Sequence, residues 1–282
     1  MAVDSWGPYL DDGRFVMPTS FLSERIASLL LALAVIPSAG QDSTTEQMER
    51  AVGPRVPSHS VYAPRFQTSL GDMIGGSGFI VRVAGEPTPL FLTAHQRFTS
   101  AAGLDRDYDG AELATLVLNV EAYSIDDSGR TLTAGPGPTI IGAGPTRSGA
   151  AWRDLAAFSV TDGGGPALSL AAHGPRNGQR IWLYARVDTA PGAPVLAPAI
   201  VERSTTGSLG YRFEDPNVRL EEARGAPMVD GEGRVVAMHV SERMEQGYLR
   251  GTGNPVDSIR RMLARATSQG DASVSAGDFE PF

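Results

Sequence analysis

Short runs of apolar residues, separated by clusters of Gly, Asp and Pro, dominate the sequence from about residue 66 onward. Runs of this length fit β-strands better than helices, and the clusters between them are typical of tight turns. The pattern therefore predicts an antiparallel β-barrel or sandwich. Strands are predicted over residues 78–83, 89–93, 114–120, 155–160, 180–184 and 234–240.

A helix is predicted near the C-terminus, over residues 254–266. Asn254 suits the N-cap, Pro255 the first helical position and Asp257 the first turn. We expect this helix to pack one face on the second lobe of the fold. The polar tail that follows, residues 267–282, is expected to be disordered. The apolar positions at helical spacing are Ile259, Met262, Leu263 and Ala266.

The N-terminal region contains a longer apolar run, residues 26–36. It is too short to span a bilayer, which needs about 20 residues, so no stable membrane span is expected. We predict that residues 1–40 form a secretory signal with its true start at Met17, the alternative being a buried N-terminal helix. A secreted or periplasmic location follows if the signal is used. The Ser-, Thr-, Pro- and Gln-rich residues 41–65 predict a linker or arm.

Composition narrows the function classes. The 282 residues include 33 Gly and 20 Pro without a strict period, which favours many short strands over a fibrous protein. Acidic residues outnumber Lys and Arg by 32 to 24, so nucleic acid is not an expected partner. The chain has no Cys, and its four His lack any metal-binding spacing. No thiolate nucleophile, metal or other cofactor is expected.

Three segments, in order along the chain, contain residues suited to acid–base and nucleophilic chemistry. The first is Gly-Ser-Gly-Phe-Ile-Val at 76–81, followed by Phe-Leu-Thr-Ala-His at 91–95. The second is Trp-Arg-Asp-Leu-Ala-Ala-Phe at 152–158. The third is Glu-Ala-Arg-Gly-Ala-Pro-Met-Val at 222–229, followed by a predicted hairpin and a strand that contains His239.

Together these segments resemble the trypsin-like serine peptidases, particularly the bacterial members. The first looks like the family's Gly-Ser-Gly-Phe strand and its Leu-Thr-Ala-Ala-His motif, the second like its Asp-Leu-Ala stretch, and the third like its Gly-Xaa-Ser-Gly-Ala/Gly-Pro-Val-Val motif. The resemblance implies an all-β, chymotrypsin-like fold of two antiparallel six-stranded β-barrels with a C-terminal α-helix. The expected barrels are residues 66–162 and 167–253, with the former active site between them.

By this resemblance, the chain order His, Asp, Ser corresponds to His95, Asp154 and Arg224. His95 takes the place of the general base, and Asp154 is expected to orient its ring by accepting the Nδ1 proton. Arg224 stands at the nucleophile position. The main-chain N–H groups of Glu222 and Arg224 match the oxyanion hole. His239 matches a His that glutamyl-specific relatives place in the specificity pocket.

The replacement of Ser by Arg224 predicts a loss of peptidase chemistry, because a guanidinium stays protonated and is no nucleophile. We expect Arg224 to pair with Asp154 or with a pocket acid such as Glu222, and to fill the former substrate site. Glu222 also stands where the family usually has glycine, which disfavours the oxyanion-hole turn. A carboxylate would be attracted to Arg224 and His239.

The resemblance therefore suggests a trypsin-like serine peptidase homologue that is catalytically inactive and binds a peptide or protein ligand. One alternative is an active serine endopeptidase with a relocated nucleophile. Another is a purely structural secreted domain. The serines considered for relocation are Ser77, Ser204, Ser208 and Ser241.

Overall fold

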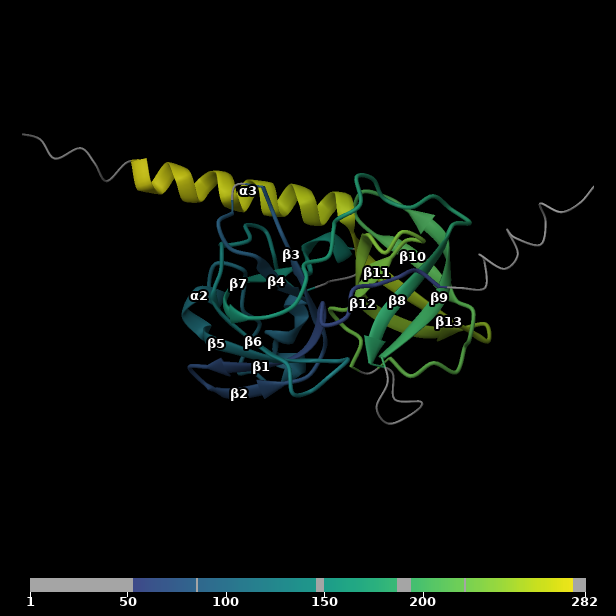
Figure 1. Cartoon of the computed structure of the whole chain (residues 1–282), viewed down its shortest axis with the longest axis horizontal. Coiled ribbons are helices and arrows are strands. Elements are labelled where there is room, and N and C mark those ends of the chain that lie inside the picture. The colour runs from purple at the N-terminus through teal and green to yellow at the C-terminus, as the bar shows by residue number, and fades with distance from the viewer. Residues whose placement is uncertain (1–52, 85, 146–149, 187–193, 221, 276–282) are drawn as a thin grey trace, which may run out of the picture. The chain divides into compact units, whose positions relative to one another are not determined.

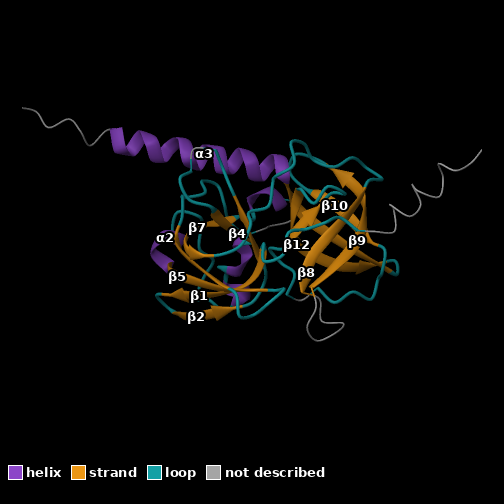
Figure 2. Ribbon diagram, in the orientation of Figure 1, coloured by secondary structure: helices purple, strands orange, loops and turns teal. Residues whose placement is uncertain are grey.

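The computed structural model describes residues 53–84, 86–145, 150–186, 194–220 and 222–275, which all belong to one compact unit, Gln47–Phe282. The predicted signal segment and its start at Met17 lie outside the described residues. Figure 2 shows the strands in two groups, together with one long helix. In chain order, with η for a 3-10 turn, the elements are β1 (Val61–Thr68), β2 (Gly71–Ile74), β3 (Gly78–Val81), β4 (Leu90–Thr93), η1 (His95–Arg97), η2 (Ser100–Ala102), α2 (Leu113–Leu116), β5 (Val117–Ser124), β6 (Thr131–Pro136), η3 (Ala151–Arg153), β7 (Ala156–Gly163), β8 (Arg180–Arg186), β9 (Pro194–Ser204), β10 (Leu209–Phe213), β11 (Pro227–Val229), β12 (Val235–Glu245), β13 (Tyr248–Pro255) and α3 (Val256–Ser275).

The N-terminal barrel is an antiparallel ring in the order β1-β3-β4-β7-β6-β5, closed by the pairing of β5 with β1. Strand β2 joins the same sheet by pairing with β1. β3 pairs with residues 61–62 of β1 and β2 with residues 65–68. Residues 75–77 lie between β2 and β3, so they interrupt the regular edge of the sheet.

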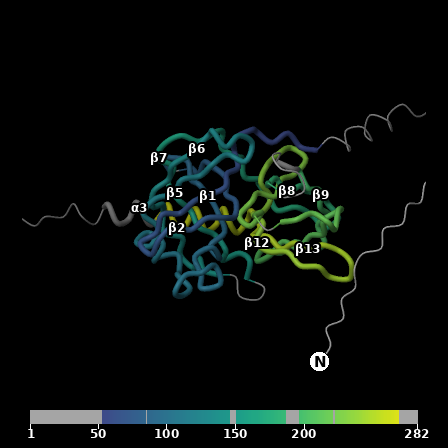
Figure 3. The backbone as a smooth tube through the Cα atoms, turned by 90° about the horizontal axis from the view of Figure 1, so that it is seen from below, coloured from purple at the N-terminus to yellow at the C-terminus, as the bar shows by residue number. Residues whose placement is uncertain are grey.

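The C-terminal barrel is a closed antiparallel ring in the order β10-β13-β12-β11-β8-β9. Figure 1 shows its green and yellow strands grouped apart from the purple and teal strands of the N-terminal barrel, and the turned view of Figure 3 shows the same division. Two closed six-stranded antiparallel barrels with a C-terminal helix are the predicted fold class, which is thereby confirmed.

The first strand begins at Val61, before the predicted start of the domain at residue 66. Its residues alternate between buried and partly exposed, as expected when one face of a strand packs on a core. Pro64 made this segment look like a linker, because Pro is unusual inside a sheet. It lies in the gap between the residues that pair with β3 and those that pair with β2.

The predicted strands all coincide with observed ones, except at the start of residues 114–120, where α2 forms instead. The Oδ1 atom of Asp109 accepts from the main-chain N–H of Glu112 at 3.1 Å. The Oε2 atom of Glu112 accepts in return from the N–H of Asp109 at 2.9 Å. These two reciprocal hydrogen bonds precede α2, a single helical turn that ends where strand β5 begins at Val117.

The C-terminal helix differs from the prediction at both ends. Asn254 and Pro255 end strand β13, and α3 starts at Val256 and continues to Ser275. The side chain of Asn254 is not a helix cap, because it donates to the main-chain oxygens of Trp152 (3.2 Å) and Asp154 (3.1 Å). Residues 267–275, which the sequence predicted to be disordered, are helical. No helix in the described part of the chain is long and apolar enough to cross a membrane.

Two of the three hydrophobic clusters fill the barrels, and the third joins them. Large aromatic side chains, among them Tyr62, Phe66 and Phe158, fill the N-terminal barrel. The third cluster combines residues of both barrels with the apolar face of α3. The helix therefore packs on more than the second lobe. Its buried positions are the predicted ones, Ile259, Met262, Leu263 and Ala266.

The close packing of β3 on β4 predicts a large effect of Gly78→Ala. A Cβ at Gly78 would lie 2.2 Å from the Phe91 ring and 2.7 Å from the main-chain oxygen of Leu92. Overpacking of this kind lowers the free energy of unfolding by about 1–3 kcal/mol. Gly231→Ala is the matched control, since nothing lies within 4 Å of its Cβ. Equal midpoints of urea denaturation for the two variants would contradict this packing.

Candidate functional site

The first and third motif segments meet where residues 75–77 of the N-terminal barrel contact residues 222–225 of the C-terminal barrel. The N–H of Ser77 donates to the main-chain oxygen of Arg224 at 2.8 Å. The Oγ of Ser77 donates to the main-chain oxygen of Glu222 at 2.7 Å, and the Oε2 of Glu222 accepts from the N–H of Gly76 at 2.8 Å. These hydrogen bonds fix the loop that contains Arg224.

Two glycines allow this close approach. Gly76 has φ of +80°, and a Cβ there would lie 2.9 Å from the main-chain oxygen of Arg224. Gly225 has φ of +93°, and a Cβ there would lie 2.1 Å from the main-chain oxygen of Ser77. Both positions thus need glycine for conformation and for space.

The second motif segment places Asp154 beside the first. Asp154 follows η3 and is fully buried. Its Oδ1 accepts from the main-chain N–H of Gln96 at 2.9 Å. The main-chain oxygen of Asp154 accepts a hydrogen bond from the side chain of Asn254. Hydrogen bonds therefore hold both the main chain and the side chain of this buried residue.

His95 does not make the hydrogen bond that the sequence predicted. Its side chain is fully buried beside Phe98, with ring centroids 6.1 Å apart, and neither ring nitrogen has a hydrogen-bond partner. The expected bond from Nδ1 to Asp154 is therefore absent. Burial lowers the pKa of His95 to about 4, although the nearby main-chain oxygen and charge of Asp109 oppose this shift. The ring is neutral at pH 7.

Gln96, which the sequence did not single out, lies beside Asp154 in the site. Besides the main-chain bond to Asp154, its Nε2 donates to the main-chain oxygen of Val240 on β12. Gln96 and Arg224 line the same cavity. The sequence did contain a signal, since Leu-Thr-Ala-His-Gln at 92–96 aligns without a gap with the Leu-Thr-Ala-Ala-His motif.

Arg224 pairs with Glu242, an acid that the sequence prediction did not name. Its Nη2 lies 3.6 Å from the Oε1 of Glu242, and its side chain is 41% exposed. Glu222, the pocket acid given as an example, is engaged with Gly76 across the contact between the barrels. Glu242 lies in strand β12, which the folding of the barrel brings to Arg224.

His239 lies at the centre of a buried chain of polar groups. Its Nδ1 is 2.5 Å from the hydroxyl of Tyr211, and its Nε2 is 3.0 Å from the Oε2 of Glu242. Burial, and then the charge of Glu242, raises the pKa of Tyr211. Burial works to raise the pKa of Glu242, but His239 and Arg224 hold it below the ordinary value. A ligand carboxylate would reach His239 only by displacing Glu242.

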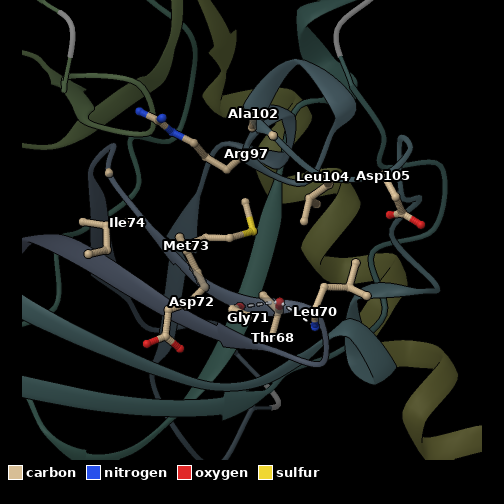
Figure 4. Close-up of a pocket in the computed structure, with 13 residues that line it drawn as sticks. Thr68, Leu70, Gly71, Asp72, Met73, Ile74, Arg97, Ala102, Leu104 and Asp105 are labelled. Carbon is tan, nitrogen blue, oxygen red and sulfur yellow. Dashed lines mark hydrogen bonds between the residues drawn. The ribbon is translucent and has the colours of Figure 1, made fainter.

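Two cavities border this arrangement, and Arg97 lines both. One, of about 290 Å³, also contains Gln96 and Arg224 in its wall. The other, of about 550 Å³, is lined by β1, the β1–β2 hairpin and the residues that follow η1. Figure 4 shows Arg97 at its rim, with the guanidinium directed away from Leu70 and Asp105. No cluster of potential metal ligands occurs among the described residues.

No family model and no curated protein matches the chain. Among solved structures, AL20, a thermostable serine protease from an extremophilic microorganism, is 15% identical in sequence and has a TM-score of 0.50. The match covers 75% of this chain and 98% of AL20. The active form of the Rv3671c protease from M. tuberculosis is 14% identical, with a TM-score of 0.48 over 86% and 94%. A human pathogenic astrovirus serine protease is 15% identical, with a TM-score of 0.44 over 74% and 96%.

The likeness to AL20 defines the class of the fold. The two barrels have the fold of the trypsin-like, chymotrypsin-fold serine proteases. Identities this low show the fold alone, and the chemistry of the cleft depends on its own residues.

The low pKa of His95 predicts a specific pH dependence of stability. A buried His whose pKa falls from its unfolded value near 6.5 to about 4 disfavours folding increasingly between these values, by about 3 kcal/mol at most. His95→Leu removes this loss, so its free energy of unfolding is expected to fall less than that of the natural chain from pH 6.5 to 4. The exposed His173, changed to Gln, is the control. If the free energy of unfolding of His95→Leu and of the natural chain changed equally with pH, His95 would not be buried as a neutral ring.

The lowered pKa of Glu242 predicts a further loss of stability on acidification, at lower pH than that of His95. A carboxylate with a lowered folded pKa stabilises the fold above its unfolded pKa, about 4.3, and this stabilisation is lost as the pH falls through the folded value. Glu242→Gln is therefore expected to show a smaller drop in melting temperature between pH 5 and 3 than the natural chain. Glu121→Gln serves as the control. Equal drops in melting temperature for Glu242→Gln and Glu121→Gln would show that Glu242 does not make its contacts with His239 and Arg224.

Proposed function

We propose that this protein is an inactive member of the serine peptidase fold that binds a peptide or protein ligand in the cleft between its barrels. The observation that carries the proposal is Arg224, which stands at the nucleophile position and pairs with Glu242. The loop that presents Arg224 is fixed to the other barrel through Ser77. The match of its sequence, Arg-Gly-Ala-Pro, to the Ser-Gly-Ala/Gly-Pro motif assigns the position.

The side chain of Arg224 has no chemistry to offer as a nucleophile. In a serine peptidase the hydroxyl attacks the scissile carbonyl after giving its proton to a His. A guanidinium remains protonated and has no lone pair available for attack. Loss of the serine alone lowers turnover by about a millionfold in a well-studied peptidase of another fold.

The general base is, on this proposal, also replaced: Gln96 stands at its position. The gapless alignment of residues 92–96 puts the motif's His at Gln96, and three contacts agree with it. Gln96 bonds to Asp154 through its N–H, bonds to Val240 through its side chain, and lines the cavity of Arg224. A carboxamide does not accept a proton at neutral pH. We therefore propose that both the nucleophile and the base are lost and that Asp154 alone remains.

A relocated serine has less support. A serine activated by His95 would share a hydrogen bond with one of its ring nitrogens, and neither nitrogen has a partner. The hydroxyl of Ser77, the candidate in the first motif, is bonded to the main-chain oxygen of Glu222. The two cavities that meet at Arg97 leave room for a ligand, which favours binding over a purely structural role.

Labelling with a fluorophosphonate, together with peptide hydrolysis, tests this proposal. The natural chain, Arg224→Ser and Gln96→His are expected to remain unlabelled, because each lacks at least one of the two groups. Labelling is expected first in Arg224→Ser/Gln96→His, and it should disappear when Asp154→Asn is added.

Two results would count against the proposal in different ways. Labelling or turnover by the natural chain would show that the protein is an enzyme, and the labelled residue would identify its nucleophile. Labelling of Arg224→Ser that is abolished by His95→Leu would show that His95 is the base. Circular dichroism of each variant confirms that it is folded.

A further inference from the structure

We infer that the cavity between Arg97 and Arg224 binds a carboxylate of the peptide ligand. This inference rests on the proposed binding function and specifies its ligand. The cavity holds about 290 Å³, and both arginines line it. Arginine forms paired hydrogen bonds with carboxylates, so two arginines at one cavity make it selective for such a group.

Arg97 is a buried cation whose hydrogen bonds are incomplete. Its Nε and Nη2 atoms are buried and have no hydrogen-bond partner. Burial lowers the pKa of Arg97, and the charge of Glu222 opposes the shift while that of Arg224 adds to it. Burying a charge without a close counter-ion is unfavourable. An anion in the cavity would stabilise the buried charge of Arg97.

The backbone of residues 75–76 is shaped around the guanidinium of Arg97. A Cβ at Gly76 would lie 2.5 Å from the Nε of Arg97 and 2.8 Å from its Nη2. A Cβ at Gly75 would lie 3.6 Å from its Nη1 and 3.2 Å from the Oε2 of Glu222. The glycine pair therefore gives Arg97 a fixed place beside the loop of Arg224, as a preorganised binding group requires.

The acids near the cavity each accept hydrogen bonds from groups other than Arg97. Glu242 lies 3.6 Å from Arg224 but also accepts a hydrogen bond from His239. The Oε2 of Glu222 accepts from the N–H of Gly76. Asp107, in the cavity wall, accepts from the N–H and Oγ of Ser100 at 3.0 and 2.9 Å. Two cations therefore face a cavity whose own acids are engaged elsewhere, and Arg224 remains 41% exposed.

The larger cavity continues from Arg97 along the N-terminal barrel and is partly apolar. Figure 4 shows Met73 and Leu104 in its wall, with Arg97 at one end. Its volume, about 550 Å³, suits side chains of an extended peptide. The ligand that fits both cavities is a peptide with a carboxylate next to apolar residues. The carboxylate comes from an Asp or Glu side chain or from the peptide's C-terminus.

Fluorescence anisotropy with labelled octapeptide pools tests this inference on the full chain. The pools carry Glu or Gln at one fixed position and end in either a carboxylate or an amide, with all other positions random. Tighter binding of the Glu pools identifies a side-chain carboxylate, and tighter binding of both pools with a free C-terminus identifies the terminal one. We expect a preference of about tenfold or more for one carboxylate.

Variants assign the preference to the two arginines. Arg97→Gln and Arg224→Gln are each expected to abolish the preference, and Arg97→Lys to restore part of it. Arg212→Gln is the matched control, because it removes an exposed cation of the C-terminal barrel whose partner is Glu202. It should leave the preference unchanged. Thermal melts confirm that each variant is folded.

The outcomes separate this inference from the proposed function. Equal binding of all four pools would overturn the carboxylate site and leave peptide binding intact. Absence of binding by every pool to the folded natural chain would overturn both the site and the peptide-binding role. Equal loss of the preference in Arg212→Gln would show a general charge effect rather than a site. Catalytic inactivity is decided separately, by the labelling experiment.

Discussion

The contact between residues 75–77 and residues 222–225 is the constraint on which the rest of the cleft depends. It consists mainly of main-chain groups, with Ser77 donating to the oxygens of Arg224 and Glu222. Because main-chain hydrogen bonds do not depend on the identity of the side chain, the loop keeps its place whichever residue occupies position 224. The fold can therefore retain the geometry of a catalytic loop while its chemistry changes.

Charged side chains surround this fixed frame. Arg224 extends toward Glu242, which is also bound to His239, and Arg97 occupies the space left by Gly76. Gln96 is an amide and His95 is a buried neutral ring, which is why we propose that no general base remains. The proposed binding role rests on the charges of the cleft and on its two cavities.

The sequence predicted the two barrels well, because short apolar runs and ordered motifs depend on local residues. It missed strands such as β2 and β13, which lack a continuous apolar run and pair in hairpins with the strands before them. In the site it named Arg224 and Asp154 but not Glu242, because no sequence motif indicated that this residue of β12 points toward Arg224. The proposed assignment of Gln96 in place of His95 rests on the gapless alignment of residues 92–96 and on the hydrogen bond of Gln96 to Asp154.

The most direct test of this account is a long-range ¹H–¹⁵N spectrum of the histidine rings in the natural chain, recorded from pH 8 to pH 4. The account predicts that His95 remains neutral down to about pH 4 and that its nitrogen shifts do not respond to Asp154→Asn, because the ring makes no bond to that carboxylate. A strongly downfield Nδ1 proton on His95 that is lost in Asp154→Asn would show an intact base and orienter, and would contradict the central claim.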